Sequence, residues 1–263
     1  MEQSESIRKA AVFVERADRI LFVTGAGISA DSGLPTYRGL GGLYEREKTD
    51  EGDSIETALS IRTFRKRPSQ AWKYIARIER ACRGSKPNSA HLFLRELEDW
   101  GKQVCILTQN VDGFHRQAGS SNVIDIHGCL HTIVCPHCPF RRSVEDYSEL
   151  AIPPLCPQCG NILRPDVVLF DEMLPPEKLS LLNAEVAKGF DLVFTVGTTA
   201  LFPYIARPVI EAASNGIPTV EIDPNRTELS HIVEIGIRDG AAAVFRKIKT
   251  RLQENRNSAE RTT

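Results

Sequence analysis

The sequence lacks a long apolar run and lacks an excess of charge of either sign. Its 263 residues contain no stretch near the ~18 apolar residues of a membrane span, and the first residues, Met-Glu-Gln-Ser-Glu, are unlike a signal peptide. Lysine and arginine number 33 against 34 aspartate and glutamate, so no overall field draws the chain to nucleic acid or anionic lipid. We therefore expect a cytoplasmic protein without a membrane or nucleic-acid partner, and its oligomeric state stays open.

A composition typical of disorder is also missing. Hydrophobic residues make up 41% and charged residues 25% of the chain, which matches globular proteins of a size that buries a proper core. A chain of 263 residues with only seven cysteines is also not a disulfide-rich miniprotein. These numbers indicate one large domain, or a core domain with a smaller addition.

Short apolar runs alternate with helical patterns along the chain. The expected strands are 19–24, 104–108, 192–196 and 219–222, and the expected helices include 7–14, 91–97 and 204–213. Strands that alternate with helices predict an α/β fold, a Rossmann-like parallel sheet with helices on both faces. Ligands of such sheets bind at the carboxyl ends of the strands.

Two stretches interrupt the alternation and are interpreted as insertions. Residues 41–90 indicate a cofactor loop and a helical insertion, and residues 129–166 a small cysteine-containing module; the Rossmann-like domain then comprises 1–40, 91–128 and 167–250. The polar tail 251–263 is expected to be disordered. Between 62 and 86, nine basic residues accompany a single acidic one, and we favour a solvated helix face over a docking surface for an acidic partner.

A glycine-rich turn follows the first expected strand. Gly25, Gly27 and Ala30 satisfy the G-x-G-x-x-A form of the dinucleotide fingerprint, whose glycines let the backbone approach a pyrophosphate at the start of a helix. A purely structural turn is the alternative. No strand-borne acidic residue follows about 20 residues later, which argues against an ordinary dehydrogenase. Asp223 or Asn225, after the strand 219–222, could hold a ribose instead.

Four of the cysteines form two Cys-x-x-Cys pairs. Cys135 and Cys138 are separated by 17 residues from Cys156 and Cys159, a spacing typical of a four-cysteine zinc ribbon. Four thiolates leave no open position for water, so the zinc ion would be structural. Two redox dithiols are the alternative, and Cys82, Cys105 and Cys129 are expected to be buried.

Polar residues follow three of the expected strands. Gln109, Asn110 and Asp112 come after the second strand, and such side chains are costly there unless they bind one another or a ligand. His127 ends a short β-like segment, where it is either a catalytic group or an ordinary satisfied histidine. The segment 197–199, Gly-Thr-Thr, offers N–H groups and hydroxyls for phosphate or ribose, or caps a helix.

Taken together, these segments resemble the sirtuins, the NAD-dependent protein-lysine deacylases, in their bacterial type. The resemblance spans the chain from Gly25 to about Ala241. It rests on residues 25–39, 108–112, 126–128, 168–175 and 197–199 and on the two Cys-x-x-Cys pairs. Several long motifs in the same order are not expected by coincidence.

The resemblance implies a mechanism in which NAD is a co-substrate. The acyl oxygen of a modified lysine attacks the ribose carbon as nicotinamide leaves. His127 then acts as general base on a ribose hydroxyl, which attacks the resulting imidate; an imidazole suits this role near neutral pH. The products are the free lysine, nicotinamide and O-acyl-ADP-ribose. His127 and Asn110 are the implied catalytic residues.

The resemblance also implies the contacts of NAD. Asn110 and Asp112 shape the nicotinamide pocket, with Gln109 beside the ribose, and Tyr37 and Arg38 belong to a mobile loop that closes over it. The full set of implied cofactor-binding residues is Gly25, Ala26, Gly27, Ala30, Tyr37, Arg38, Gln109, Asn110, Asp112, Gly197, Thr198, Thr199, Asp223, Asn225 and Ala241.

The acylated protein substrate is expected to bind as an extended strand. Two segments resemble the edges that clamp a peptide through its main chain: Val167, Val168 and Phe170, and the stretch after Thr199. Because main-chain binding recognises sequence weakly, many protein substrates are expected to be accepted.

The chain departs from the family pattern in three places. Thr36-Tyr-Arg replaces Asp-Phe-Arg, and Asp171 replaces a glycine. Gly-Thr-Thr at 197–199, followed by Phe202-Pro-Tyr204, replaces the usual Gly-Thr-Ser.

Acyl specificity has two interpretations. Acetyl is the expected group, but Tyr74 and Arg77 match the spacing of a Tyr-x-x-Arg pair that holds the carboxylate of succinyl or malonyl lysine. Against this, Tyr74 lies two residues after Trp72 rather than three, which rotates its side chain by about 100° around a helix. Two different functions stay open beside deacylation: transfer of ADP-ribose to protein, and binding of NAD and zinc without catalysis.

Overall fold

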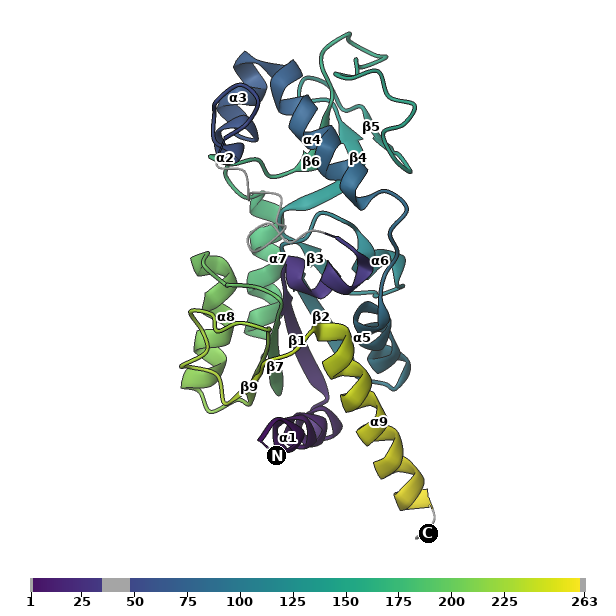
Figure 1. Cartoon of the computed structure of the whole chain (residues 1–263), viewed down its shortest axis with the longest axis vertical. Coiled ribbons are helices and arrows are strands. Elements are labelled where there is room, and N and C mark those ends of the chain that lie inside the picture. Colours follow the sequence, from purple (N-terminus) through teal and green to yellow (C-terminus); the bar gives the residue numbers. More distant parts are fainter. Residues whose placement is uncertain (1, 35–47, 261–263) are drawn as a thin grey trace.

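A six-stranded parallel sheet forms the larger part of the molecule in the computed structural model, which describes residues 2–34 and 48–260 (Figure 1). Its strand order is β3-β2-β1-β7-β8-β9. The strands are β1 (Arg19–Thr24), β2 (Gln103–Thr108), β3 (Val123–Asp125), β7 (Leu192–Val196), β8 (Thr219–Ile222) and β9 (Ile235–Ile237). All four predicted strands are present, and the parallel Rossmann-like sheet is confirmed.

Helices cover both faces of this sheet. They are α1 (Glu2–Arg16), α5 (Ser89–Asp99) and α9 (Ala241–Glu260) on one face, and α7 (Pro176–Ala187) and α8 (Pro203–Ser214) on the other. Alternate residues of β1 supply the two cores: Phe22 packs with α9 and Val23 with α8. The Phe22 ring stacks on Phe194 at 4.9 Å and meets Phe245 of α9 edge-on at 6.0 Å.

The smaller part of the molecule, at the top of Figure 1, combines both predicted insertions. It contains α2 (Ile55–Ala58), α3 (Ile61–Lys66), α4 (Pro68–Cys82) and the antiparallel strands β4 (Gly128–Val134), β5 (Arg141–Ser143) and β6 (Arg164–Val167). One hydrophobic core joins the two insertions, and Trp72 of α4 donates a hydrogen bond from Nε1 to the Leu163 carbonyl at 2.8 Å. The insertions therefore fold as one unit.

Helix α9 corrects the expected disordered tail. It runs to Glu260, because Leu252 continues the apolar face of Phe245 and Ile248 and is 4% exposed. Farther along, the Arg256 guanidinium lies 4.2 Å from the centre of the Trp100 ring. These contacts hold residues whose polarity alone suggests disorder.

Candidate active site

The carboxyl ends of β1, β2 and β7 lie level, which brings their polar loops together. Thr24 pairs with Thr108 of β2 and Val196 of β7. Gly25 donates its N–H to the Val196 carbonyl at 3.0 Å, and Gly27 donates to the Gly197 carbonyl at 2.9 Å. Three sequence-predicted cofactor segments thus meet at one edge of the sheet.

Close backbone approach explains the glycines of this edge. A Cβ atom on Gly27 would lie 2.5 Å from Cα of Gly197, and Gly197 itself has φ +59. Only glycine fits both positions without moving one loop away from the other. The helix expected at this turn is a 3-10 helix, η1 (Ala26–Ser32), and it ends at Gly33 in the left-handed conformation.

A buried hydrogen-bond network centres on Ser29. Its hydroxyl donates to Asp112 Oδ2 at 2.8 Å and accepts from Asn110 Nδ2 at 3.2 Å, while Asn110 Nδ2 also donates to the Gly25 carbonyl at 3.0 Å. Burial raises the pKa of Asp112. Asn110 Oδ1 is buried and has no hydrogen-bond partner in the described part of the chain. An amide N–H of a ligand would satisfy it, as the carboxamide of nicotinamide could.

Two residues of this network, Ser29 and His91, are not among the predicted site residues. His91 Nε2 lies 3.4 Å from the Ser29 hydroxyl, and its Nδ1 accepts from the Asn88 N–H at 3.3 Å in a capping box at the start of α5. The Asn-x-x-His spacing is a local signal for that helix start. The contact between His91 and Ser29 has no such signal, because it joins residues 62 positions apart.

Gln109 and Thr198 join the ends of β2 and β7. Gln109 Nε2 donates to the Thr198 hydroxyl at 2.7 Å, whereas Thr199 is exposed. Asp223 follows β8 and accepts from the Asn225 N–H at 2.8 Å. Burial raises the pKa of the half-buried Asp223. Because β8 runs parallel to β7, the Asp223 carboxylate lies at the same edge of the sheet, in a position suited to a ribose diol.

Four further residues were predicted to contact the cofactor. Ala30 lies on the exposed part of η1, and Ala241 begins α9. Ala242, the next residue, donates its N–H to Asp31 Oδ2 at 3.1 Å, which ties α9 to η1. Tyr37 and Arg38 lie outside the described residues.

His127 occupies the turn between β3 and β4. Its Nδ1 lies 3.1 Å from the Gln109 carbonyl and its Nε2 lies 2.7 Å from the Tyr204 hydroxyl. Burial lowers its pKa, which favours the neutral imidazole that a general base requires. In the sequence, Tyr204 stands out only as part of a departure from the family pattern, and no local signal links it to His127.

The predicted peptide-binding segment connects His127 to the smaller part. Val168 donates its N–H to the His127 carbonyl at 2.8 Å, and Val167 pairs with Gly128. Phe170 donates to the Leu59 carbonyl at 3.1 Å. Asp171, where the family pattern has glycine, adopts φ 61. The departure therefore keeps the left-handed turn that favours glycine.

Tyr74 and Arg77 lie together on α4, with the guanidinium 4.9 Å from the centre of the Tyr74 ring. Both contact carboxylates of this chain: the phenol donates to Glu51 and Arg77 pairs with Asp50 at 2.6 Å. The Tyr74 hydroxyl also accepts from the Asp50 N–H at 3.0 Å. The pair is thus already hydrogen-bonded to acidic groups.

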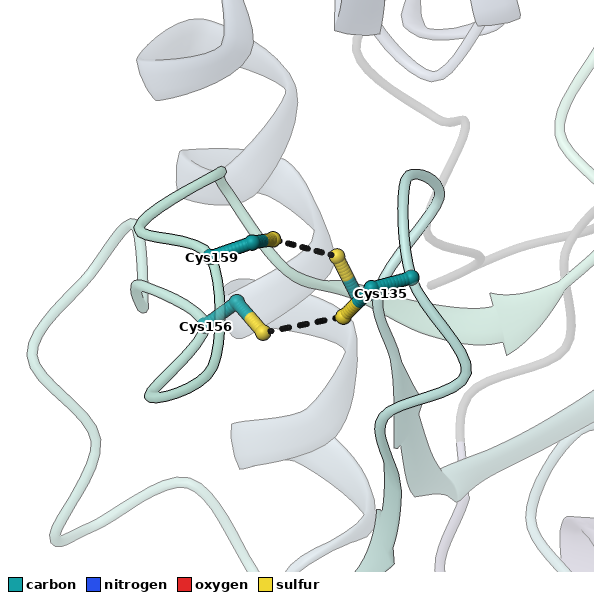
Figure 2. Close-up of side chains that lie close together, drawn as sticks. Cys135, Cys156 and Cys159 are labelled. Carbon is teal, nitrogen blue, oxygen red and sulfur yellow. Dashed lines mark hydrogen bonds between the residues drawn. The ribbon is translucent and has the colours of Figure 1, made fainter.

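The four predicted metal ligands converge in the smaller part (Figure 2). The sulfur atoms of Cys135, Cys138, Cys156 and Cys159 all lie within 4.8 Å of one another, and none is in a disulfide. The Cys135–Cys159 and Cys138–Cys156 sulfur pairs are each 3.5 Å apart. A tetrahedral site with Zn–S bonds near 2.3 Å has sulfur atoms about 3.8 Å apart, so these residues fit a structural zinc ion.

Comparison with known proteins identifies the class of this fold and site. The model of the "Sir2 family" matches residues 25–202. A protein of Pseudomonas aeruginosa named "NAD-dependent protein deacylase 2" is 45% identical to this chain, over 94% of this chain and 98% of its own length. The chain therefore belongs to the Sir2 family, and it is of the bacterial sirtuin type.

Solved structures agree with this assignment. A structure titled "crystal structure of a Sir2 homolog-NAD complex" is 35% identical, with a TM-score of 0.83 and 94% of each chain covered. A structure titled "Sir2-p53 peptide-NAD+" is 25% identical, with a TM-score of 0.80, and covers 93% of this chain and 97% of its own. Across residues 2–34 and 48–260, no helix has the length and apolar character needed to cross a bilayer.

Proposed function

We propose that this chain removes acyl groups, acetyl foremost, from protein lysine side chains with NAD as co-substrate. His127 carries the proposal, because it is a partly buried imidazole that lies against the Gln109 carbonyl at the end of β2 and whose pKa burial lowers. The names of the Sir2-family relatives, NAD-dependent protein deacylases, support the same activity. The expected products are nicotinamide, O-acyl-ADP-ribose and the free lysine.

Different residues bind the pyrophosphate, the ribose and the nicotinamide of NAD and accept the proton. The close packing of Gly25 and Gly27 against the loop after β7 positions the start of η1, where a pyrophosphate would bind, and Asp223 accepts hydrogen bonds from a ribose diol. Asn110 and Asp112 bind the carboxamide of nicotinamide; the free Oδ1 of Asn110 supports this role. His127 accepts the proton of a ribose hydroxyl through Nε2, since Nδ1 faces the Gln109 carbonyl.

The acylated peptide binds as a strand along 167–170. Hydrogen bonds of this segment to His127 and Leu59 hold it rigidly beside the base. Main-chain pairing would supply most of the affinity, so many protein sequences should be accepted. The peptide complex of a Sir2 structure supports a peptide partner of this kind.

Acetyl is preferred over succinyl in this proposal because of Asp50 and Glu51. A succinyl carboxylate would have to displace both carboxylates from Tyr74 and Arg77. A neutral acetyl group requires no such exchange.

The zinc ion, when bound to the four thiolates, supplies a structural crosslink and no catalysis. The cysteine loops pack in one core with α4, so the ion stabilises the smaller part of the molecule. We also place the protein in the cytoplasm, where reduced thiols are available for zinc.

The test is turnover of one peptide carrying acetyl- or succinyl-lysine, with and without NAD. Deacetylation should require NAD and fall at least 100-fold in His127→Ala, and removal of acetyl should exceed removal of succinyl. Arg77→Met serves as the specificity control and should leave acetyl turnover unchanged. Undiminished deacetylation by His127→Ala would refute the proposed base.

Labelled NAD separates deacylation from ADP-ribosyl transfer to protein. In the proposed reaction the ADP-ribose label leaves with the acyl group. Label that remains on protein would instead support a transferase.

A further inference from the structure

Two aromatic rings lie against His127 in an arrangement that the proposed reaction does not use. Phe202 and Tyr204 meet the imidazole nearly perpendicularly, with ring centres 5.8 and 6.0 Å away, and stack on each other at 5.4 Å. Tyr204 is the second residue of α8, so the start of that helix places its ring beside the base. Among the described residues, His127 is the only hydrogen-bond partner of the phenol, at 2.7 Å from Nε2.

The direction of this hydrogen bond follows from the other partners of the two groups. A carbonyl only accepts, so Nδ1 of His127, which faces the Gln109 carbonyl, carries the ring hydrogen, and Nε2 carries the lone pair. Burial raises the pKa of Tyr204 to about 12, so the phenol keeps its proton at neutral pH. The phenol therefore donates to the nitrogen that must act as base.

We propose that Tyr204 is a positioning residue that caps Nε2 of His127 in the ligand-free chain and gives way to the ribose hydroxyl. This inference rests on the proposed function and deepens it. Nε2 has one lone pair, so it cannot accept from the phenol and from the ribose hydroxyl together. The cap fixes the tautomer and the ring orientation of His127 until the substrate hydroxyl replaces the phenol.

The cap also changes the basicity of His127. A donor on Nε2 stabilises the neutral ring, so removal of the hydroxyl should raise the pKa of His127. The other charged groups that face His127 are Lys178 on α7, which lowers its pKa, and Asp125, whose carbonyl accepts from Lys178 Nζ at 2.6 Å. Gln109 and Val168 contribute only backbone groups. None of these changes when Tyr204 loses its hydroxyl.

The test compares wild type with Tyr204→Phe, which removes the hydroxyl and keeps the stacked ring. The pKa of His127 is measured by NMR titration of the imidazole, with the signal assigned by its loss in His127→Ala. It should rise by roughly half to one pH unit, the equivalent of one hydrogen bond. The acidic limb of kcat/KM should move to higher pH by the same amount, because the neutral base is then lost earlier on acidification.

Tyr147→Phe is the matched control. It removes the buried hydrogen bond of Tyr147 to the Leu130 carbonyl, which is 2.7 Å long and involves no atom of His127. It should leave the pKa of His127 unmoved even if it lowers stability. Above the limb, kcat/KM of Tyr204→Phe should equal wild type or exceed it by up to about fivefold, because no phenol must be displaced.

Three results would overturn the cap: an unchanged pKa of His127 in Tyr204→Phe, a tenfold lower plateau of kcat/KM with an unmoved limb, or a wild-type imidazole protonated at Nε2. The last measurement needs no variant and applies even if Tyr204→Phe is unstable. Failure of the wild type to deacylate would instead refute the proposed function. The NMR titration does not depend on turnover, so the two failures are distinguishable.

Discussion

Gly27→Ala should weaken both the fold and the proposed NAD site. The added Cβ would lie 2.5 Å from Cα of Gly197, whereas carbon atoms pack at about 3.5 Å, so the two loops must separate by roughly 1 Å. Overpacking of this kind costs roughly 1–3 kcal/mol of unfolding free energy. The shift also stretches the 2.9 Å hydrogen bond from the Gly27 N–H to Gly197.

Gly216→Ala separates this clash from ordinary backbone strain. Gly216 has φ +70 with no atom within 4 Å of a Cβ, and it lies at the opposite edge of the sheet, before β8. It should lose about 1 kcal/mol of stability and keep its affinity for NAD. Calorimetric titration of NAD should give a Kd at least tenfold weaker for Gly27→Ala. Wild-type affinity in that variant would refute the argument that close backbone approach builds the site.

Three further predictions concern other parts of the molecule. Cys156→Ser should lose the single zinc ion and shift Trp72 fluorescence towards that of exposed indole, because one core joins the cysteine loops to α4; Cys82→Ala, measured by metal analysis alongside, should keep the ion. Burial lowers the pKa of His91 to about 4, so the unfolded chain binds a proton first as pH falls. The contribution of His91 to the free energy of unfolding should therefore decrease between pH 6.5 and 4, by up to about 3 kcal/mol; burial also lowers the pKa of His115, so His91→Asn should reduce but not abolish the pH dependence in denaturant titrations. Leu252→Ala should cost about 2–4 kcal/mol in the same assay, and no loss would show that the end of α9 adds nothing.

Local patterns were sufficient to predict four of the six strands of the sheet and the edge at which they end, but not the short strand β9. Apolar runs such as 19–24 identify strands buried on both faces, and parallel strands end at a common edge. Polar residues that follow those runs are therefore expected at that edge, where Asn110 and Asp112 both contact the Ser29 hydroxyl. The cysteine spacing was equally informative because the ligands of a metal site must converge.

Contacts between distant segments carry no comparable signal. The hydrogen bond from Tyr204 to His127 depends on where α8 begins, and the contact of Ser29 with His91 depends on how α5 packs beside η1. Composition was misleading at the carboxyl end, where Arg256 is held by the Trp100 ring. Tertiary contacts decide these positions, and single-sequence patterns do not contain them.

The packing of α9 on β1 has a consequence for synthesis on the ribosome. Among the described strands, β1 pairs with β2 on one side and β7 on the other, and Phe245 completes the aromatic cluster around Phe22. On a nascent chain, β1 can pair with β2 once residue 108 has emerged, but its other edge stays open until residue 196 has emerged, and its core stays open until α9 follows. Such long-range closure is slow and exposes apolar surface. The first strand to be made is thus among the last to be protected.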